Sequence, residues 1–92
     1  MKSDQAIVAA LQALQWLVAD KGRIGAFLNQ AGMAPDELAQ RASDPEFLAA
    51  IVDFILADEA SVLAYAHDAG LKPETLMQVR MALPGGQVPH WT

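Results

Sequence analysis

Two histidines are the side chains best suited to acid–base chemistry near neutral pH. His67 is followed by Asp68, and His90 stands beside Trp91. No nucleophile lies at a recognisable spacing from either imidazole, and no His-x-x-x-His or Glu-x-x-His pattern suggests a metal site. Near a helix end, His67 is more typical of a structural side chain beside the negative end of the helix dipole.

Three carboxylates are the remaining candidates for a paired acid–base site: Asp53, Asp58 and Glu59. Their positions favour a solvated helix edge for the first and a helix junction for the other two. The chain also lacks a glycine-rich loop that could hold a phosphate. We therefore expect a protein that is not an enzyme, with no catalytic residues, no cofactor, no metal and no small-molecule substrate.

The composition limits the elements that could position such side chains. The 92 residues are 53% hydrophobic, which fits one small domain. A net charge of −5 disfavours nucleic acid and anionic membranes as partners, and the absence of cysteine fits a reducing cytoplasm. The most apolar run, 47–57, contains Asp53 and is too short to cross a membrane.

Alanine and leucine dominate the apolar residues, while no stretch alternates with the period of a strand. We therefore predict an all-α fold, a compact bundle of about six helices. The expected helices cover 4–20 with an end near Gly22, 23–31, 35–42, 45 to about 57, 59–69, and 73–83.

Prolines, glycines and capping residues set these boundaries. Gly32 and Gly70 suit left-handed helix ends, and Pro73 suits a first helical turn. The segment Ser43-Asp44-Pro45-Glu46 predicts a helix start capped by a hydroxyl or a carboxylate, with Glu46 placed three residues after Ser43 as in a capping box. Because no glycine marks the junction near Asp58, a single kinked helix from 45 to 69 stays an alternative.

An internal repeat appears when the chain is shifted by 38 residues. Segment 16–20 then aligns with 54–58, and the Ala-Gly-apolar-x-Pro pattern at 31–35 aligns with 69–73. This predicts two pseudo-repeated three-helix units, each covering the apolar face of the other. Residues 1–84 would form a single helical domain and 85–92 a flexible C-terminal tail.

The stretches FLNQAGMAPDELAQRASDPEFLAAIVDFILADEA and AGLKPETLMQVRMALPGG resemble a family of small alphaproteobacterial proteins that carries only a domain-of-unknown-function label. The resemblance covers most of the chain and rests on helix starts and stops. It implies a compact bacterial all-helical protein. It implies no activity and no functional residues.

A helix-turn-helix is one functional alternative. Tyr65, Ala66, Gly70, Leu71, Leu76 and Val79 have the spacing of two helices that cross at a glycine turn. The second helix begins near Glu74 and offers only Lys72 and Arg80 as basic groups, which is few for a DNA duplex. DNA binding is therefore the second hypothesis, behind a purely structural corner.

A protein-interaction surface is the first hypothesis. Leu76, Val79 and Leu83 form the inward stripe of the last helix, whereas Met77 and Met81 lie one turn apart on another face. We predict a cytoplasmic, non-catalytic interaction module that binds an unidentified protein or a second copy of itself. The predicted partner-binding residues are Met77, Met81, Arg80 and Trp91.

Overall fold

A computed structural model describes residues 1–84 of the chain. Across these residues it contains α-helices and no β-strand, which confirms the predicted all-α class. The helices are α1 (Ser3–Val18), α2 (Lys21–Ala31), α3 (Glu37–Arg41), α4 (Pro45–Leu56), α5 (Glu59–Ala69) and α6 (Pro73–Met81). The predicted tail, 85–92, lies outside the described residues.

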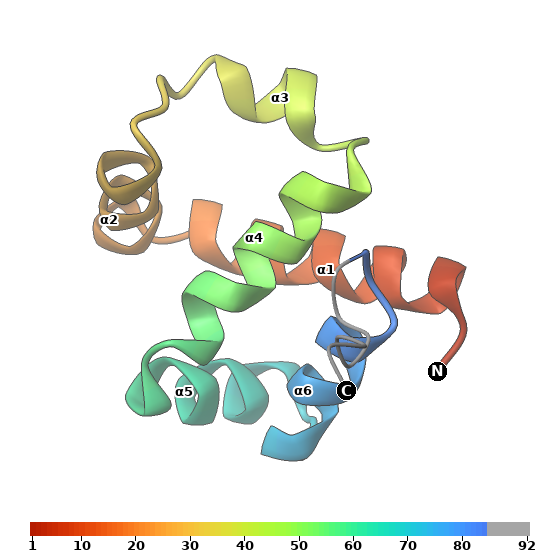
Figure 1. The fold of residues 1–92 in the computed structure, drawn as a ribbon. Coiled ribbons are helices and arrows are strands. Elements are labelled where there is room, and N and C mark those ends of the chain that lie inside the picture. Colours follow the sequence, from red (N-terminus) through yellow and green to blue (C-terminus); the bar gives the residue numbers. More distant parts are fainter. Residues whose placement is uncertain (85–92) are drawn as a thin grey trace, which may run out of the picture.

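Helix α4 is the central element of the bundle. It contacts α1, α5 and α6, and in Figure 1 it crosses α1, with α3 above its upper end, α5 at its lower end and α2 to its left. Its inward side chains are fully buried: Leu48, Ile51, Val52 and Ile55. The opposite strip faces solvent, because Glu46, Ala50, Asp53 and the C-cap Ala57 are exposed.

Helix α1 presents small side chains to the rest of the core. Ala6, Ala10 and Ala13 are completely buried at helical spacing, and Leu17 continues the stripe. A methyl group projects little from a helix, so α4 and α6 can pack close to this face of α1.

Glycines end α2 and α5 as predicted. Gly32 and Gly70 have φ of 67° and 68°, a left-handed conformation that costs other residues free energy. After Gly70 the N–H of Leu71 donates to the Ala66 carbonyl at 2.8 Å, and an equivalent bond follows Gly32. These bonds satisfy carbonyl groups that the end of the helix would leave without partners.

The predicted boundary at Gly22 is wrong. Helix α1 ends at Val18, and Gly22 belongs to the first turn of α2. The reason is Asp20, whose carboxylate accepts hydrogen bonds from the N–H groups of Gly22 and Arg23 at 2.9 and 3.2 Å. An aspartate cap starts a helix and tolerates glycine in the turn that follows.

At the start of α4 the carboxylate cap is confirmed, whereas the capping box of Ser43 with Glu46 is wrong. Asp44, not Ser43, is the N-cap, and its carboxylate accepts the Glu46 N–H at 3.0 Å. The kinked-helix alternative is excluded as well, because Asp58 is extended at φ −128° and ψ 111° and separates α4 from α5. The side-chain hydroxyl of Ser61 donates to Asp58 at 2.7 Å.

Helices α3 and α6 are shorter than predicted. Helix α3 covers five residues instead of Pro35–Ala42, and α6 ends at Met81 instead of Leu83. Leu83 is nevertheless buried, so its predicted inward position is confirmed. The apolar pattern therefore continues into a turn that is no longer α-helical.

Helix boundaries recur at the predicted offset of 38 residues in part of the chain. Helices α2 and α5 have the same length, and each is followed by a left-handed glycine. The third members differ, since α3 buries no residue whereas α6 buries Leu76 and Val79. The arrangement of two equivalent three-helix units stays a prediction.

No helix within residues 1–84 is both long enough and apolar enough to span a membrane.

Candidate functional site

The candidate acid–base residues do not form a common site, and two of them make structural contacts. His67 is exposed on α5. Asp53 pairs with Arg80, and the Asp58 carboxylate accepts the hydroxyl of Ser61. Within residues 1–84, no three histidine or acidic side chains come together in a group that could hold a metal ion.

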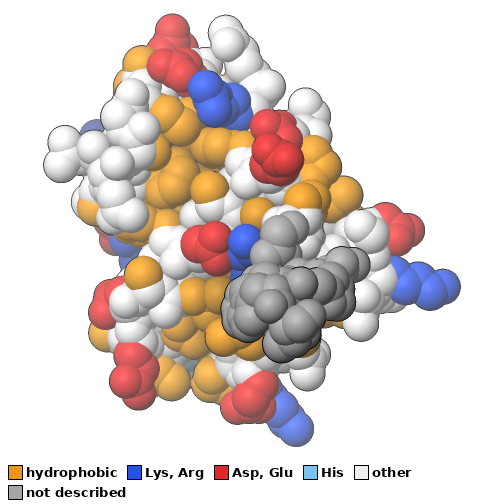
Figure 2. Space-filling model, viewed as in Figure 1, with side chains coloured by type: hydrophobic (Ala, Val, Ile, Leu, Met, Phe, Trp, Pro, Cys, Tyr) orange, Lys and Arg blue, Asp and Glu red, His pale blue; other side chains and the backbone are white. Residues whose placement is uncertain are grey.

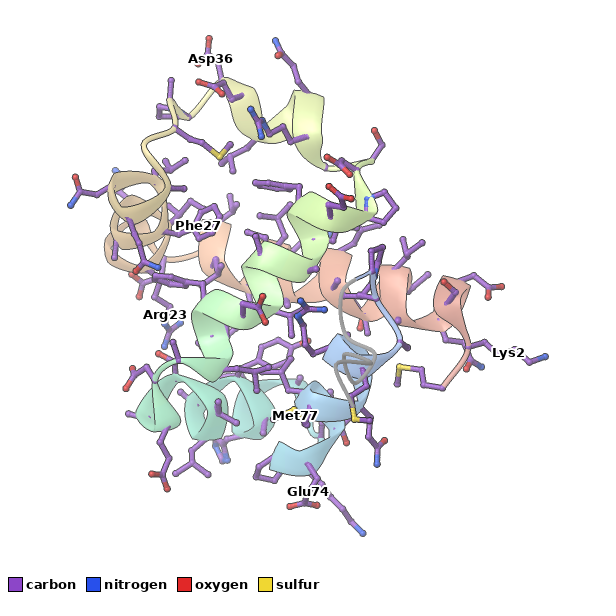
Figure 3. The ribbon with its side chains drawn as sticks, viewed as in Figure 1. Lys2, Arg23, Phe27, Asp36, Glu74 and Met77 are labelled. Carbon is purple, nitrogen blue, oxygen red and sulfur yellow. The ribbon has the colours of Figure 1, made fainter. Side chains whose placement is uncertain are left out.

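The two methionines of α6 are exposed side by side along the helix. Met77 and Met81 expose 51% and 53% of their surface, while Leu76 and Val79 on the opposite side are buried. We call Met77 and Met81 the methionine face; Figure 3 labels the first of them. Two large apolar side chains one turn apart form a continuous apolar strip on the surface.

Arg80 lies between the two methionines in sequence but serves a different contact. Its Nε donates to Asp53 of α4 at 2.6 Å, and its terminal N–H donates to the Pro84 carbonyl at 3.0 Å. The side chain is only 18% exposed. Arg80 therefore joins α6 to α4 and to the turn after α6, and direct contact with a partner stays a prediction.

Trp91, the fourth predicted partner-binding residue, lies outside the described residues.

The corner between α5 and α6 has the elements of the helix-turn-helix alternative. Tyr65 and Ala66 are buried, and Gly70 makes the turn. Lys72 is exposed at the start of α6, beside the exposed Glu74. Arg80 is paired with Asp53, so it is not free to neutralise a phosphate group. The corner therefore does not support nucleic-acid binding.

A polar and aromatic cluster around Trp16 was not predicted from the sequence. The Trp16 indole N–H donates to Asp68 of α5 at 2.8 Å, and its ring packs edge-on against Tyr65 at 5.3 Å. The guanidinium of Arg23 stacks 3.8 Å from the centre of the Trp16 ring. Burial raises the pKa of Tyr65 above its ordinary value. The cluster ties together α1, α2 and α5.

A groove between α2, α3 and α4 was also not predicted. It has a volume of about 570 Å³, and Figure 2 shows hydrophobic side chains gathered in this hollow. Its apolar residues are Phe27, Ala31, Met33, Phe47, Ala50 and Phe54. Its charged residues are Glu37, Arg41, Asp44, Glu46 and Asp53. We call this set of residues the α4 groove.

No sequence signal could have placed the α4 groove or the Trp16 cluster. Asp68 is 52 positions from Trp16, and Asp53 is 27 positions from Arg80. Helical periodicity reports which face of one helix is apolar, but not which side chains of different helices meet.

Comparison with known proteins gives a family but no function. No curated protein and no solved structure has significant similarity to the chain. The sequence model of one family, described as protein of unknown function (DUF3572), matches residues 3–86. This match includes all the helices described above. The chain therefore belongs to the DUF3572 family of proteins of unknown function.

Proposed function

We propose that the chain is a cytoplasmic, non-catalytic protein-interaction module that binds its partner through the methionine face of α6. The observation that carries this proposal is the exposure of Met77 and Met81, at 51% and 53%, on one side of the same helix. Unbranched, polarisable methionine side chains adapt to the shape of a partner. Covering two such side chains removes apolar surface from water, which favours association.

The attachment of α6 to the bundle supports this role. Leu76 and Val79 anchor the helix in the core. The ion pair of Arg80 with Asp53 joins α6 to α4. A helix held in this way presents its outer side chains in a fixed arrangement. Less conformational entropy is then lost when a partner binds, which favours the complex. We assign Arg80 to positioning the methionine face.

Affinity capture with matched variants tests the proposal. A Met77→Ala, Met81→Ala double variant removes the methionine face, and a Val8→Ala, Val18→Ala double variant trims exposed apolar side chains on α1. All three proteins would be immobilised and exposed to lysate of cells that naturally contain the chain. We expect one captured protein that the unmodified chain and the valine variant retain and the methionine variant loses. Unchanged capture by the methionine variant would refute the assignment.

Sedimentation velocity identifies the class of partner. If the methionine face binds a second copy of the chain, the unmodified protein sediments as a dimer at micromolar concentration and the methionine variant as a monomer. If it binds a different protein, both sediment as monomers. A dimer that persists in the methionine variant would place the contact elsewhere.

A further inference from the structure

We propose that the α4 groove is a second binding surface, which accepts a short basic amphipathic helix from a partner protein. The α4 groove lies among α2, α3 and α4, whereas the methionine face belongs to α6. The proposal therefore goes beyond the function assigned to the methionine face and does not depend on it.

Aromatic rings held by edge-on packing lie beneath the α4 groove: Phe27 and Phe47 are buried, and Phe54 is half-buried. Phe27 extends from α2 toward α4, as Figure 3 shows, and packs edge-on against Phe47 at 5.9 Å and Phe54 at 5.3 Å. These contacts fix the rings before any partner arrives. Beside them the exposed side chain of Ala50 is only a methyl group, which leaves space above α4. Apolar side chains of a partner could fill this space.

The extent of the groove fits a helix of about three turns. The exposed strip of α4 begins at Glu46 and ends at Ala57, nearly the length of the helix. Twelve helical residues extend over roughly 18 Å. A second hollow of about 540 Å³ shares Gln30 and Phe54 with the α4 groove and continues toward α5. A partner helix can therefore lie along α4 instead of touching one point.

The charges around both hollows select a basic partner. The acidic residues that line them are Asp20, Glu37, Asp44, Glu46, Asp53 and Asp58, and the basic ones are Arg23 and Arg41. Arg41 lies 3.8 Å from Glu37 and Arg23 lies 3.9 Å from Asp20, so each is already close to an acid. Asp53 is likewise paired, with Arg80. Lysine or arginine beside the apolar face of a partner helix would complement the remaining carboxylates, Asp44, Glu46 and Asp58. A second copy of the chain, at a net charge of −5, would be repelled.

Titration with synthetic peptides tests the proposal. The probe is a helical peptide of roughly three turns, with leucines on one face and lysines elsewhere. One control peptide carries glutamate in place of lysine, and another has the same composition with the leucines scattered around the helix. Affinity would be measured by calorimetry, and the contacted residues by changes in amide NMR shifts.

Two matched variants locate the binding. Ala50→Lys adds a long cation to the floor of the α4 groove, while Ala60→Lys makes the same change at an exposed alanine of α5 outside both hollows. Both sites are exposed, so both variants should fold, which circular dichroism checks. We expect Ala50→Lys to weaken binding of the lysine peptide about tenfold and Ala60→Lys less than about twofold.

Each outcome decides for or against the groove. Binding of the lysine peptide that is roughly tenfold tighter than that of either control, with shifts in α2, α3 and α4, supports the proposal. Equal losses in Ala50→Lys and Ala60→Lys would show diffuse attraction to an acidic protein and overturn it. Tighter binding of the glutamate peptide, equal binding of the scattered peptide, or no binding at all would also overturn it. So would a loss caused by the Met77→Ala, Met81→Ala variant.

Discussion

Trp16 contacts residues of two other helices, and each contact involves a different part of its side chain. The indole N–H binds Asp68, one face of the ring receives the Arg23 guanidinium, and the ring packs edge-on against Tyr65. Each contact adds a modest free energy, of the order of 1 kcal/mol or less at an exposed site. Their combined effect is to fix the position of α5 relative to the end of α1.

The pKa of Tyr65 makes the stability of the fold sensitive to alkaline pH. Burial raises this pKa above the ordinary value of 10.0. Below that value the tyrosine is protonated in both the folded and the unfolded chain. As the pH rises above it, the unfolded chain loses the proton first, so the free energy of unfolding falls.

A Tyr65→Phe variant checks this pH dependence. Phenylalanine cannot ionise, so we expect the unfolding free energy of the unmodified protein to fall relative to that of the variant as the pH is raised above 10.0. Urea unfolding at several pH values measures this difference. Because Tyr65 is the single tyrosine of the sequence, tyrosinate absorbance reports its titration directly. Ionisation at the ordinary pKa in the folded protein would contradict the assignment.

At the level of elements, the left-handed glycines decide where α2 and α5 end. A Cβ atom added at Gly70 meets no atom within 4 Å, so any cost of Gly70→Ala comes from its φ of 68°. We expect a loss of about 1–2 kcal/mol in the free energy of unfolding. Gly25 also has open space but lies inside α2, so Gly25→Ala should stabilise the protein by roughly 0.5–1 kcal/mol.

Denaturant unfolding of the two variants separates conformation from packing. The two substitutions add the same methyl group in open space, so opposite signs are expected from backbone conformation alone. A Gly70→Ala variant as stable as the unmodified protein would show that the turn between α5 and α6 does not need the left-handed conformation.

Helix boundaries could be predicted where the backbone itself sets them. Proline at the start of α4 and α6 has a fixed φ that suits a first helical turn, and glycine after α2 and α5 takes a left-handed conformation that other residues avoid. Aspartate is less specific, because it can cap a helix or lie on its surface. The sequence therefore did not reveal that Asp20 begins α2, and it left Ser43 and Asp44 as alternative caps of α4.

The methionine face could be predicted from the sequence, whereas the α4 groove could not. The outward position of Met77 and Met81 follows from the period of one helix and could be predicted. The α4 groove depends on how three helices pack, and the commitment of Arg80 to Asp53 depends on how α6 packs against α4. Neither is encoded in a local pattern.

For the whole molecule, the burial of apolar residues predicts a gradient of local stability. Helix α4 buries six residues, α2 buries only Phe27 and α3 buries none. Local opening of α3 therefore exposes little apolar surface and should cost little free energy. Amide hydrogen exchange should be fastest in α3 and slowest in α1 and α4. Protection of the α3 amides equal to that of α4 would contradict this picture of the core.

Photo-crosslinking from the methionine face tests most directly whether this face binds a partner. A benzophenone amino acid would replace Met77 or Met81 in one set of proteins and the exposed Val8 or Val18 of α1 in a control set. Each protein would be irradiated in lysate of cells that naturally contain the chain. We predict one crosslinked adduct, of defined mass, from both methionine positions and none from the valine positions. Equal adducts from α1 and α6, or no adduct from α6, would contradict it.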